Sequence, residues 1–381
     1  MSHTTQNGIL SPEPPNPKLS VLLLASDLGP TGAARQLALL ATGLPRARFE
    51  VAVGVCGRAD TPAADDLRRA GVAVVEIGIR HNLDVSGARK LRAAVARLGP
   101  AVVHAWGEEA AWATAWLAGS RTAPRVVVSA AASPGGSVGG WVTTRRVRRA
   151  DRVIAASRAE GERYHRLGVA GDRLTRIIPA VATPAAPPDR GGFLRGLGLP
   201  ENARLVVTAG RLDARSGLKT AVWAFDILRY EYPNHYLLVF GDGPGRAGLE
   251  EFGLALGFDD YRVVFPGYRH DLPALLGLAD VVWVTQDRGG VNLALEAMAA
   301  GRPVVAWKTA DVGGVVDDGE SGLLVPPGER AQVSARTHAL LTDPARANVL
   351  GAAGRARAAE RFGVARMVEQ HARLYAEVAE R

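Results

Sequence analysis

Cysteine and lysine are both scarce in this sequence of 381 residues. The single cysteine, Cys56, excludes a disulfide-stapled scaffold and a cysteine-rich zinc site, and it suits a reducing compartment. Four of the 46 basic residues are lysine, so nearly all of the positive charge is arginine. Unbroken apolar runs of about 18 residues are also lacking, so we expect no membrane-spanning helix.

The rest of the composition is that of a folded globular chain. Hydrophobic residues make up 47% and charged residues 22%, which excludes a disordered, collagen-like or coiled-coil protein. The length exceeds what one hydrophobic core usually serves, so two domains are expected. Residues 1–17 are proline-rich and lack the basic start and apolar stretch of a signal peptide, which predicts a disordered tail on a cytoplasmic protein.

Short runs rich in valine and leucine alternate with segments of helical periodicity. In the first half the expected strands are Leu19–Ala25, Phe49–Val55, Val72–Ile77, Ala101–Trp106, Pro124–Ala130 and Arg152–Ser157. In the second half they are Arg204–Gly210, His235–Gly241, Arg262–Gly267, Ala279–Thr285 and Arg302–Trp307. This alternation predicts an α/β fold of two doubly wound, Rossmann-like domains with parallel sheets. The proline-rich stretch Pro179–Gly192 is the expected linker, and ligands of this architecture bind in a cleft between the carboxyl ends of the sheets.

The segment Arg288–Trp307 carries the strongest sign of a ligand site. Gly289 and Gly290 follow an expected strand, and a helix is predicted to begin near Asn292. The free amides of a helix start bind anions, and glycines let the backbone approach a ligand closely. Glu296 lies one turn further on, where its carboxylate would accept hydrogen bonds from a sugar diol. The alternative is an alanine-rich core helix in which Glu296 merely favours the helix dipole.

A second strand end carries cations. Arg211 follows the strand that ends at Gly210, and Arg215 and Lys219 lie nearby. Cations at a strand end that faces a cleft suit a diphosphate, which arginine can bind through two hydrogen bonds.

A third strand end is rich in glycine, at positions 241, 243 and 245. The spacing is similar to that of a dinucleotide-binding loop, but Arg246 stands where the third glycine of that fingerprint belongs. Gly243 therefore belongs either to a phosphate cradle or to a tight turn between a strand and a helix.

Together these segments resemble the group 1 (family 4) glycosyltransferases of GT-B fold. The resemblance is carried by GRLDARSG, GDGPGRAGLE, GYRHDLPALLGLADVVWVTQ, LALEAMAAGRPVVA and DDGESGLLVPPGE, and by LGPTGAARQLALLATGL near the start. It implies an acceptor domain at residues 18–185 and a nucleotide-sugar domain at 186–362. It also implies that a last helix, within residues 363–381, returns to the first domain.

Residue roles follow from the same resemblance. Arg211 matches the family's diphosphate-binding arginine, and Glu296 matches the glutamate that holds the nucleotide ribose. The backbone at Gly32 would face the donor phosphates, and Tyr268 lies in the segment that would line the base pocket. No cofactor or metal is expected, because the leaving diphosphate would be stabilised by protein groups and the sequence has no Asp-x-Asp pair.

Three positions depart from the family's pattern. Arg288 stands where a second glutamate often contacts the donor sugar, and Ser216 stands where a lysine binds phosphate. Ala131 lies at or next to the place of a sugar-facing histidine. His104 is the nearby imidazole, and it is either a packed histidine or a substitute catalytic contact.

The leading hypothesis is therefore a glycosyltransferase that moves a sugar from a nucleoside diphosphate to a glycan, a lipid-linked or a small-molecule acceptor, with retention of configuration. The second is a noncatalytic descendant that binds ligands or acts as a scaffold. A dinucleotide-dependent oxidoreductase is a third, supported only by the imperfect glycine loop and the alternating strands. The net charge of +8 and the arginines of Trp141–Arg152 suit an anionic membrane, although a solvated helix face would look the same. We expect no nucleic-acid partner.

Overall fold

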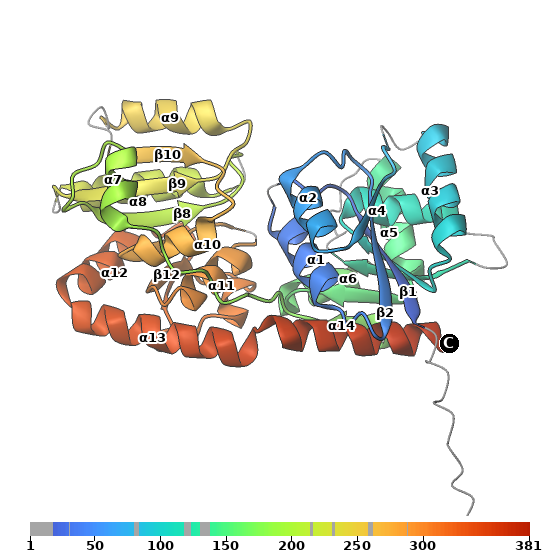
Figure 1. The fold of residues 1–381 in the computed structure, drawn as a ribbon. Coiled ribbons are helices and arrows are strands. Elements are labelled where there is room, and N and C mark those ends of the chain that lie inside the picture. Colours follow the sequence, from blue (N-terminus) through green and yellow to red (C-terminus); the bar gives the residue numbers. More distant parts are fainter. Residues whose placement is uncertain are drawn as a thin grey trace, which may run out of the picture.

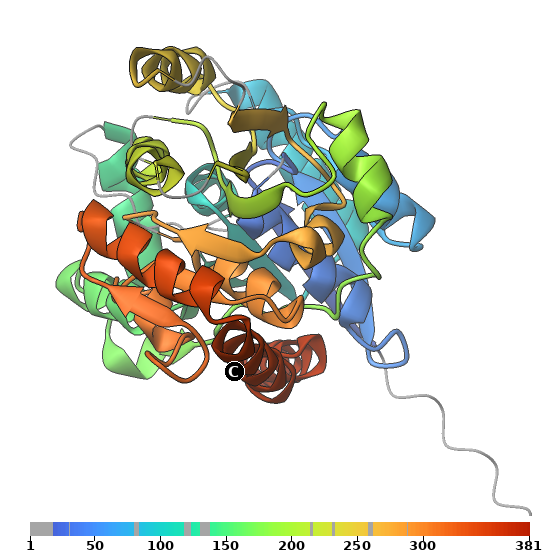
Figure 2. The same cartoon turned by 90° about the vertical axis from the view of Figure 1, so that its left-hand side faces the viewer.

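The computed structural model describes residues 18–29, 31–79, 84–117, 123–129, 138–213, 216–230, 233–257, 262–287 and 289–381. They form two lobes that lie side by side, each built on a parallel sheet with helices on both faces (Figure 1). In the view from the side of the second lobe, the last helix is seen nearly end-on (Figure 2). Within the described ranges, no helix is both long enough and apolar enough to cross a bilayer.

The described part of the first lobe holds a seven-stranded sheet in the order β3-β2-β1-β4-β5-β6-β7. Its strands are β1 Leu19–Ala25, β2 Phe49–Val55, β3 Ala73–Glu76, β4 Val102–Trp106, β5 Arg125–Ser129, β6 Arg152–Ala155 and β7 Leu174–Arg176. Its helices are α1 Gly32–Gly43, α2 Pro62–Arg69, α3 Val85–Leu98, α4 Glu108–Ala113, α5 Val138–Arg149 and α6 Arg158–Arg166. The strands pair in parallel and lie between two apolar clusters, as the near-continuous apolar runs predict.

The described part of the second lobe holds a six-stranded sheet in the order β10-β9-β8-β11-β12-β13. Its strands are β8 Arg204–Ala209, β9 His235–Phe240, β10 Val263–Gly267, β11 Val281–Val284, β12 Val304–Trp307 and β13 Leu323–Val325. Its helices are α7 Arg190–Gly196, α8 Leu218–Arg229, α9 Arg246–Ala255, α10 Leu272–Leu275, α11 Val291–Ala299, α12 Arg330–Thr342 and α13 Pro344–Arg361. Short 3-10 helices lie at Thr114–Leu117, Gly171–Arg173, Leu276–Leu278 and Val312–Gly314.

Two edge strands, β7 and β13, were not predicted from the sequence, and the end of the linker was predicted too late in the chain. β7 and β13 have three residues each, which is too short for an apolar run to stand out. The linker was expected to extend to Gly192, but α7 already begins at Arg190, because the Asp189 carboxylate accepts a hydrogen bond from the Gly192 amide at 2.6 Å and caps the helix.

The chain crosses between the lobes twice, and the crossings are joined. The first crossing is the linker, whose Val181 amide donates to the Phe362 carbonyl at 2.8 Å. The second lies between α13 and the last helix, α14 Val364–Ala379, which run end to end along one side of both lobes (Figure 1). α14 packs its apolar face into the core of the first lobe, against α1 and β4.

A buried histidine cluster fixes α14 to the first sheet. His104 on β4 is fully buried and hydrogen-bonds the Tyr375 hydroxyl at 2.6 Å and the Ser129 hydroxyl at 2.7 Å. The His371 ring lies 5.7 Å from that of His104 and donates through Nδ1 to the Met367 carbonyl. Burial lowers the pKa of His371 to about 4 and holds the pKa of His104 well below its usual range, with the nearby His371 adding to the shift at His104.

This cluster predicts that the protein loses stability as the pH falls below about 6.5. The pKa of each histidine is lower in the folded chain than in the unfolded chain, so between the two values the unfolded chain binds more protons. For His371 the full effect, reached near pH 4, is on the order of 3 kcal/mol. Urea denaturation of the wild type and of His371→Leu at several pH values measures it. The variant should lose less stability than the wild type over this range, and parallel losses would contradict the prediction.

Candidate functional site

A pocket of about 350 Å³ lies in the cleft and receives residues from both lobes. The first lobe contributes Thr31, Gly32 and Arg35, at the start of α1. The second lobe contributes the ends of β8, β9 and β11, the segment after β10, and the first turns of α11. The residues from the second lobe are Ala209, Gly210, Arg211, Asp213, Ser216, Phe240, Gly241, Tyr268, Arg269, Leu272, Gln286, Gly290, Asn292, Leu293 and Glu296.

The start of α11 opens on this pocket. The helix begins at Val291, one residue before the expected start, and Gly290 precedes it without a side-chain cap. The first amides of such a helix have no partner within the helix, so they are free to bind an anion. Gly289 does not line the pocket, and its amide faces the Asp311 carboxylate at 3.4 Å.

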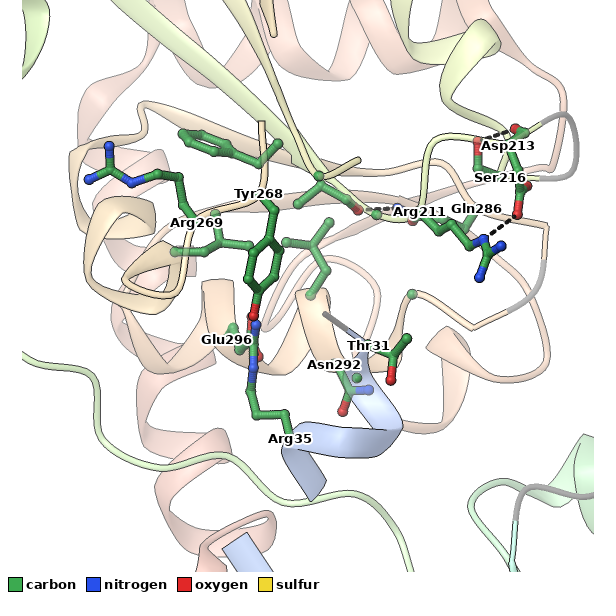
Figure 3. A pocket seen from close by; sticks show the side chains of 18 residues that line it. Thr31, Arg35, Arg211, Asp213, Ser216, Tyr268, Arg269, Gln286, Asn292 and Glu296 are labelled. Carbon is green, nitrogen blue, oxygen red and sulfur yellow. Dashed lines mark hydrogen bonds and ion pairs between the residues drawn. The ribbon is translucent and has the colours of Figure 1, made fainter. Parts of the chain in front are cut away.

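Glu296 lies on the second turn of α11 and is almost completely buried, with 7% of its side chain exposed. It forms an ion pair with Arg35, which reaches across from α1 of the first lobe (Figure 3). Burial raises the pKa of Glu296, and the charge and hydrogen bond of Arg35 offset that shift only in part. Burial lowers the pKa of Arg35, but Glu296, with a smaller effect from Tyr268, outweighs burial and raises it.

Other contacts of α1, with α11 and with Ala180 of the linker, surround this ion pair. The Gln36 side chain donates to the Ala180 carbonyl at 2.7 Å and accepts from the Ala180 amide at 2.8 Å. The same amide nitrogen of Gln36 donates to Asn292 Oδ1 at 3.0 Å. Gly32 lies so close to Asn292 that a Cβ there would come within 2.0 Å of the Asn292 amide nitrogen. We call this contact, made by Gly32, Arg35 and Gln36 with Asn292 and Glu296, the α1–α11 clasp.

Arg211 lies on the opposite wall of the pocket. Its side chain is 69% exposed, and its Nε lies 3.5 Å from the Asp213 carboxylate. Ser216, at the position of the family's phosphate lysine, also lines the pocket, and its hydroxyl donates to the Asp213 carbonyl at 2.8 Å. Arg211 is held only by this exposed ion pair and can turn towards an anion, whereas Ser216 is already engaged with its own loop.

The glycine-rich loop after β9 supports the Arg211 loop by close backbone packing. Gly241 has a positive φ of 125°, and a Cβ there would meet the Gly210 carbonyl at 1.9 Å. Gly243 lies against Leu212, whose carbonyl would be 2.4 Å from a Cβ at that position. Gly241 lines the pocket and Gly243 does not, so the structure favours the tight turn for Gly243 over a phosphate cradle.

The structure brings together Gly32, Arg211, Tyr268, Gly290, Asn292 and Glu296, and it leaves other candidates outside the pocket. His104 is packed beneath α14 with both ring nitrogens hydrogen-bonded, so it does not reach the pocket as a catalytic contact. Lys219 lies over the Phe252 ring, with its amine 4.3 Å from the ring centre, because α8 turns it away from the cleft. Arg215, Arg288 and Ala131 lie outside the described residues.

Arg35 and Gln36 were missed from the sequence, where they read as polar positions of an amphipathic helix. Asp311 was missed as well: one of its carboxylate oxygens faces the Gly289 amide, and the other accepts from the Ser157 hydroxyl of the first lobe. The usable signal for Arg35 was its place one turn after Gly32, which puts both on the same helix face. Within the described ranges, no group of three or more His, Cys, Asp or Glu side chains is placed to hold a metal.

Comparison with known sequences agrees with this architecture. Residues 203–343 match the family model described as Glycosyl transferases group 1, and residues 30–183 match Glycosyltransferase Family 4. A 2-deoxystreptamine glucosyltransferase of Streptomyces kanamyceticus is 32% identical over 205 residues, which cover 51% of this chain and 52% of that protein. A GDP-mannose-dependent alpha-(1-6)-phosphatidylinositol monomannoside mannosyltransferase of Mycolicibacterium smegmatis is 30% identical over 220 residues, 54% of this chain and 57% of that one. The chain thus matches about half the length of these curated relatives.

Solved structures match over nearly the whole chain. Anabaena HepE, crystallised with UDP and glucose, superposes with a TM-score of 0.83 at 22% identity and covers 94% of this chain and 99% of its own. Sucrose-phosphate synthase from Thermosynechococcus elongatus gives 0.76 at 22% identity, with 95% and 99% covered. Two facing Rossmann-like domains with a pocket in the cleft define a protein of GT-B fold. Within that class, the chain belongs to the group 1, family 4 glycosyltransferases.

The α1–α11 clasp predicts that Gly32→Ala lowers stability by about 1 to 2 kcal/mol, because the new methyl group displaces Asn292 and breaks its bond to Gln36. The midpoint of thermal unfolding measures this loss. Gly32→Ala combined with Asn292→Ala should recover most of the cost of the clash. Gly248→Ala in α9, where a Cβ meets no atom within 4 Å, is the matched control. An unfolding midpoint for Gly32→Ala equal to that of this control would contradict the prediction.

Proposed function

We propose that the protein is a glycosyltransferase that moves a sugar from a nucleoside-diphosphate donor to an acceptor hydroxyl, with retention at the anomeric carbon. The observation that carries the proposal is the cleft pocket, in which Arg211, the free start of α11 and the buried Glu296 face one space. Such a set suits two parts of a nucleotide: the anionic diphosphate for the arginine and the helix start, and the ribose diol for the carboxylate. The UDP and UDP-glucose bound to HepE support the same donor class.

In this proposal the bond between the anomeric carbon and the diphosphate breaks, the acceptor oxygen forms the new bond, and the acceptor's hydroxyl proton passes to the leaving diphosphate. Negative charge grows on the leaving diphosphate, and fixed positive groups that face it lower the barrier. Arg211 and the amides at the start of α11 are those groups, so a metal or cofactor is not required for this role. Among the described residues that line the pocket, the arginines are Arg35, Arg211 and Arg269 and the carboxylates are Asp213 and Glu296, an excess of cations that suits a diphosphate.

Tyr268 and Arg269 are the proposed neighbours of the base. They follow β10 and line the end of the pocket next to Glu296 (Figure 3). The Tyr268 ring packs edge-on against His270, with 4.8 Å between the ring centres, and this contact holds its hydroxyl near Arg35.

A noncatalytic binding protein is the second candidate, and the state of Ser216 favours it. Ser216 stands where the family's phosphate-binding lysine is expected, so that position supplies no cation. The hydroxyl of Ser216 is also turned to its own loop instead of towards a phosphate. Such a protein would bind a nucleotide or sugar and release no product.

We also propose a peripheral contact of α5 with an anionic membrane. α5 carries Arg145, Arg146, Arg148 and Arg149. The pKa of Arg146 is lowered, mainly by partial burial and to a smaller extent by repulsion from the like charges of Arg149 and Arg145. A nearby anion would relieve this repulsion between the arginines.

Calorimetric titration with UDP, GDP and ADP tests the donor site. We expect one of them to bind, and we expect Arg211→Ala and Glu296→Gln each to weaken it by about 10- to 100-fold, because each removes a charged hydrogen bond of about 1.5 to 3 kcal/mol. Lys219→Ala should bind as the wild type does, since this amine lies over Phe252 outside the pocket.

The proposal would be contradicted if the wild type bound none of the three nucleotides. It would also be contradicted if Arg211→Ala and Glu296→Gln bound a nucleotide as tightly as the wild type does. Radiolabelled UDP-, GDP- and ADP-sugars then separate the two candidates. Release or transfer of the labelled sugar supports the transferase, and binding without release supports the noncatalytic protein.

Sedimentation with phosphatidylcholine vesicles, with and without anionic lipid, tests the membrane contact. The wild type should pellet with the anionic vesicles, and replacing the four arginines of α5 by alanine should release it, at about 1 kcal/mol for each arginine. If the wild type and the four-alanine variant pelleted equally, the proposed membrane contact of α5 would be contradicted.

A further inference from the structure

The first lobe sends a charged side chain into the site that the donor's nucleotide would occupy, and the proposed function counts only its positive charge. Arg35 comes from α1, is about two-thirds buried with 30% of its side chain exposed, and ends on the Glu296 carboxylate. We propose that Arg35 is a positioning residue of the nucleotide site, which holds Glu296 ionised and oriented for the hydroxyl groups of a nucleoside. This inference rests on the proposed function and adds a residue from the other domain to it.

The geometry fixes Arg35 in this position. Gly32, Arg35 and Gln36 are spaced three and four residues apart, so they lie on one face of α1. Gln36 is buried and bonds to Asn292 and to both backbone groups of Ala180, and Gly32 packs on Asn292. These contacts set the distance between the two helices, and Arg35 spans it to reach Glu296 one turn further along α11.

The groups around Glu296 leave Arg35 as its counter-charge among the described residues. α11 has no other titratable side chain, and neither do β11 and β12, which pack against it. On α13, Arg355 donates to the Ala300 carbonyl and Arg357 pairs with Asp317. In the pocket, Arg269 pairs with Asp271 and Arg211 with Asp213, while Tyr268 faces Arg35.

The charge state of Glu296 decides what it can bind. An ionised carboxylate accepts hydrogen bonds at both oxygens, whereas a protonated one has a donor in place of one acceptor. Burial alone favours the protonated form, and Arg35 opposes it. Without Arg35, the pKa of Glu296 would rise further, and the site would lose its acceptor as the pH falls.

Nucleotide affinity against pH tests this inference in the full-length protein. The probes are UDP-glucose, GDP-mannose and ADP-glucose, whose diphosphates, bonded at both ends, do not titrate in this range. We expect Arg35→Met to lose about tenfold in affinity between about pH 8 and pH 6, as Glu296 takes up a proton, while the wild type changes less. Arg35→Lys keeps a cation in place and should restore most of the wild-type profile.

Three variants make the result specific. Glu296→Gln should bind weakly with no pH dependence in this range, and adding Arg35→Met to it should change little. Arg373→Met removes an arginine from an exposed ion pair with Glu369 on α14 and should match the wild type. Far-ultraviolet circular dichroism at each pH shows that every variant is folded.

The two proposals fail in different ways. If the wild type binds none of the three probes, the proposed function falls and the role of Arg35 falls with it. If the wild type binds but Arg35→Met keeps the wild-type pH profile, the role of Arg35 alone is overturned. Tighter binding by Arg35→Met at every pH would also overturn it, because Arg35 would then compete with the nucleotide for Glu296.

Discussion

The buried carboxylate of Glu296 is the constraint on which the arrangement of the cleft depends. A charged group that leaves water loses several kcal/mol of solvation, and it is tolerated only beside a cation or strong hydrogen-bond donors. In this chain the cation comes from the other domain, so the charge balance of α11 depends on the position of α1. The contacts of Gln36 and Gly32 hold the two helices at the spacing that this balance requires.

The opposite wall of the pocket is set by backbone packing instead of charge. The loops after β8 and β9 touch at Gly241 and Gly243, where no larger residue would leave room. The Gln286 amide, which donates to the Ala209 carbonyl at 2.7 Å, ties the end of β11 to the end of β8. Arg211 therefore stands on a rigid turn while its own side chain is mostly exposed, which leaves it able to follow a ligand.

The sequence predicts those parts of the fold that depend on local pattern. Leu19–Ala25 and Phe49–Val55 are strands with the expected bounds, because a short, near-continuous apolar run rich in valine and leucine suits a strand buried on both faces of a parallel sheet. β7 and β13 have three residues each and exist because a neighbouring strand pairs with them, which no local pattern records.

The candidate site divides in the same way. Arg211 and Glu296 could be picked from motifs, since their own segments carry the signal. Arg35 and Asp311 have meaning only through partners on the other lobe, at Glu296 and Ser157, so a reading of each segment by itself could not find them. His104 shows the opposite error: an imidazole at a strand end is a reasonable catalytic candidate until a helix from the far end of the chain covers it.

The place of α14 has a consequence for the order in which the protein is made. This helix supplies Met367, Leu374 and Tyr375 to the core of the first lobe, although the whole second lobe separates it from that lobe in the sequence. On the ribosome, the first lobe emerges early with the part of its core that α14 covers still exposed, including Phe49, whose ring packs against Tyr375. That lobe can close its core only after the second has been synthesised, so the two lobes complete folding together despite having separate sheets.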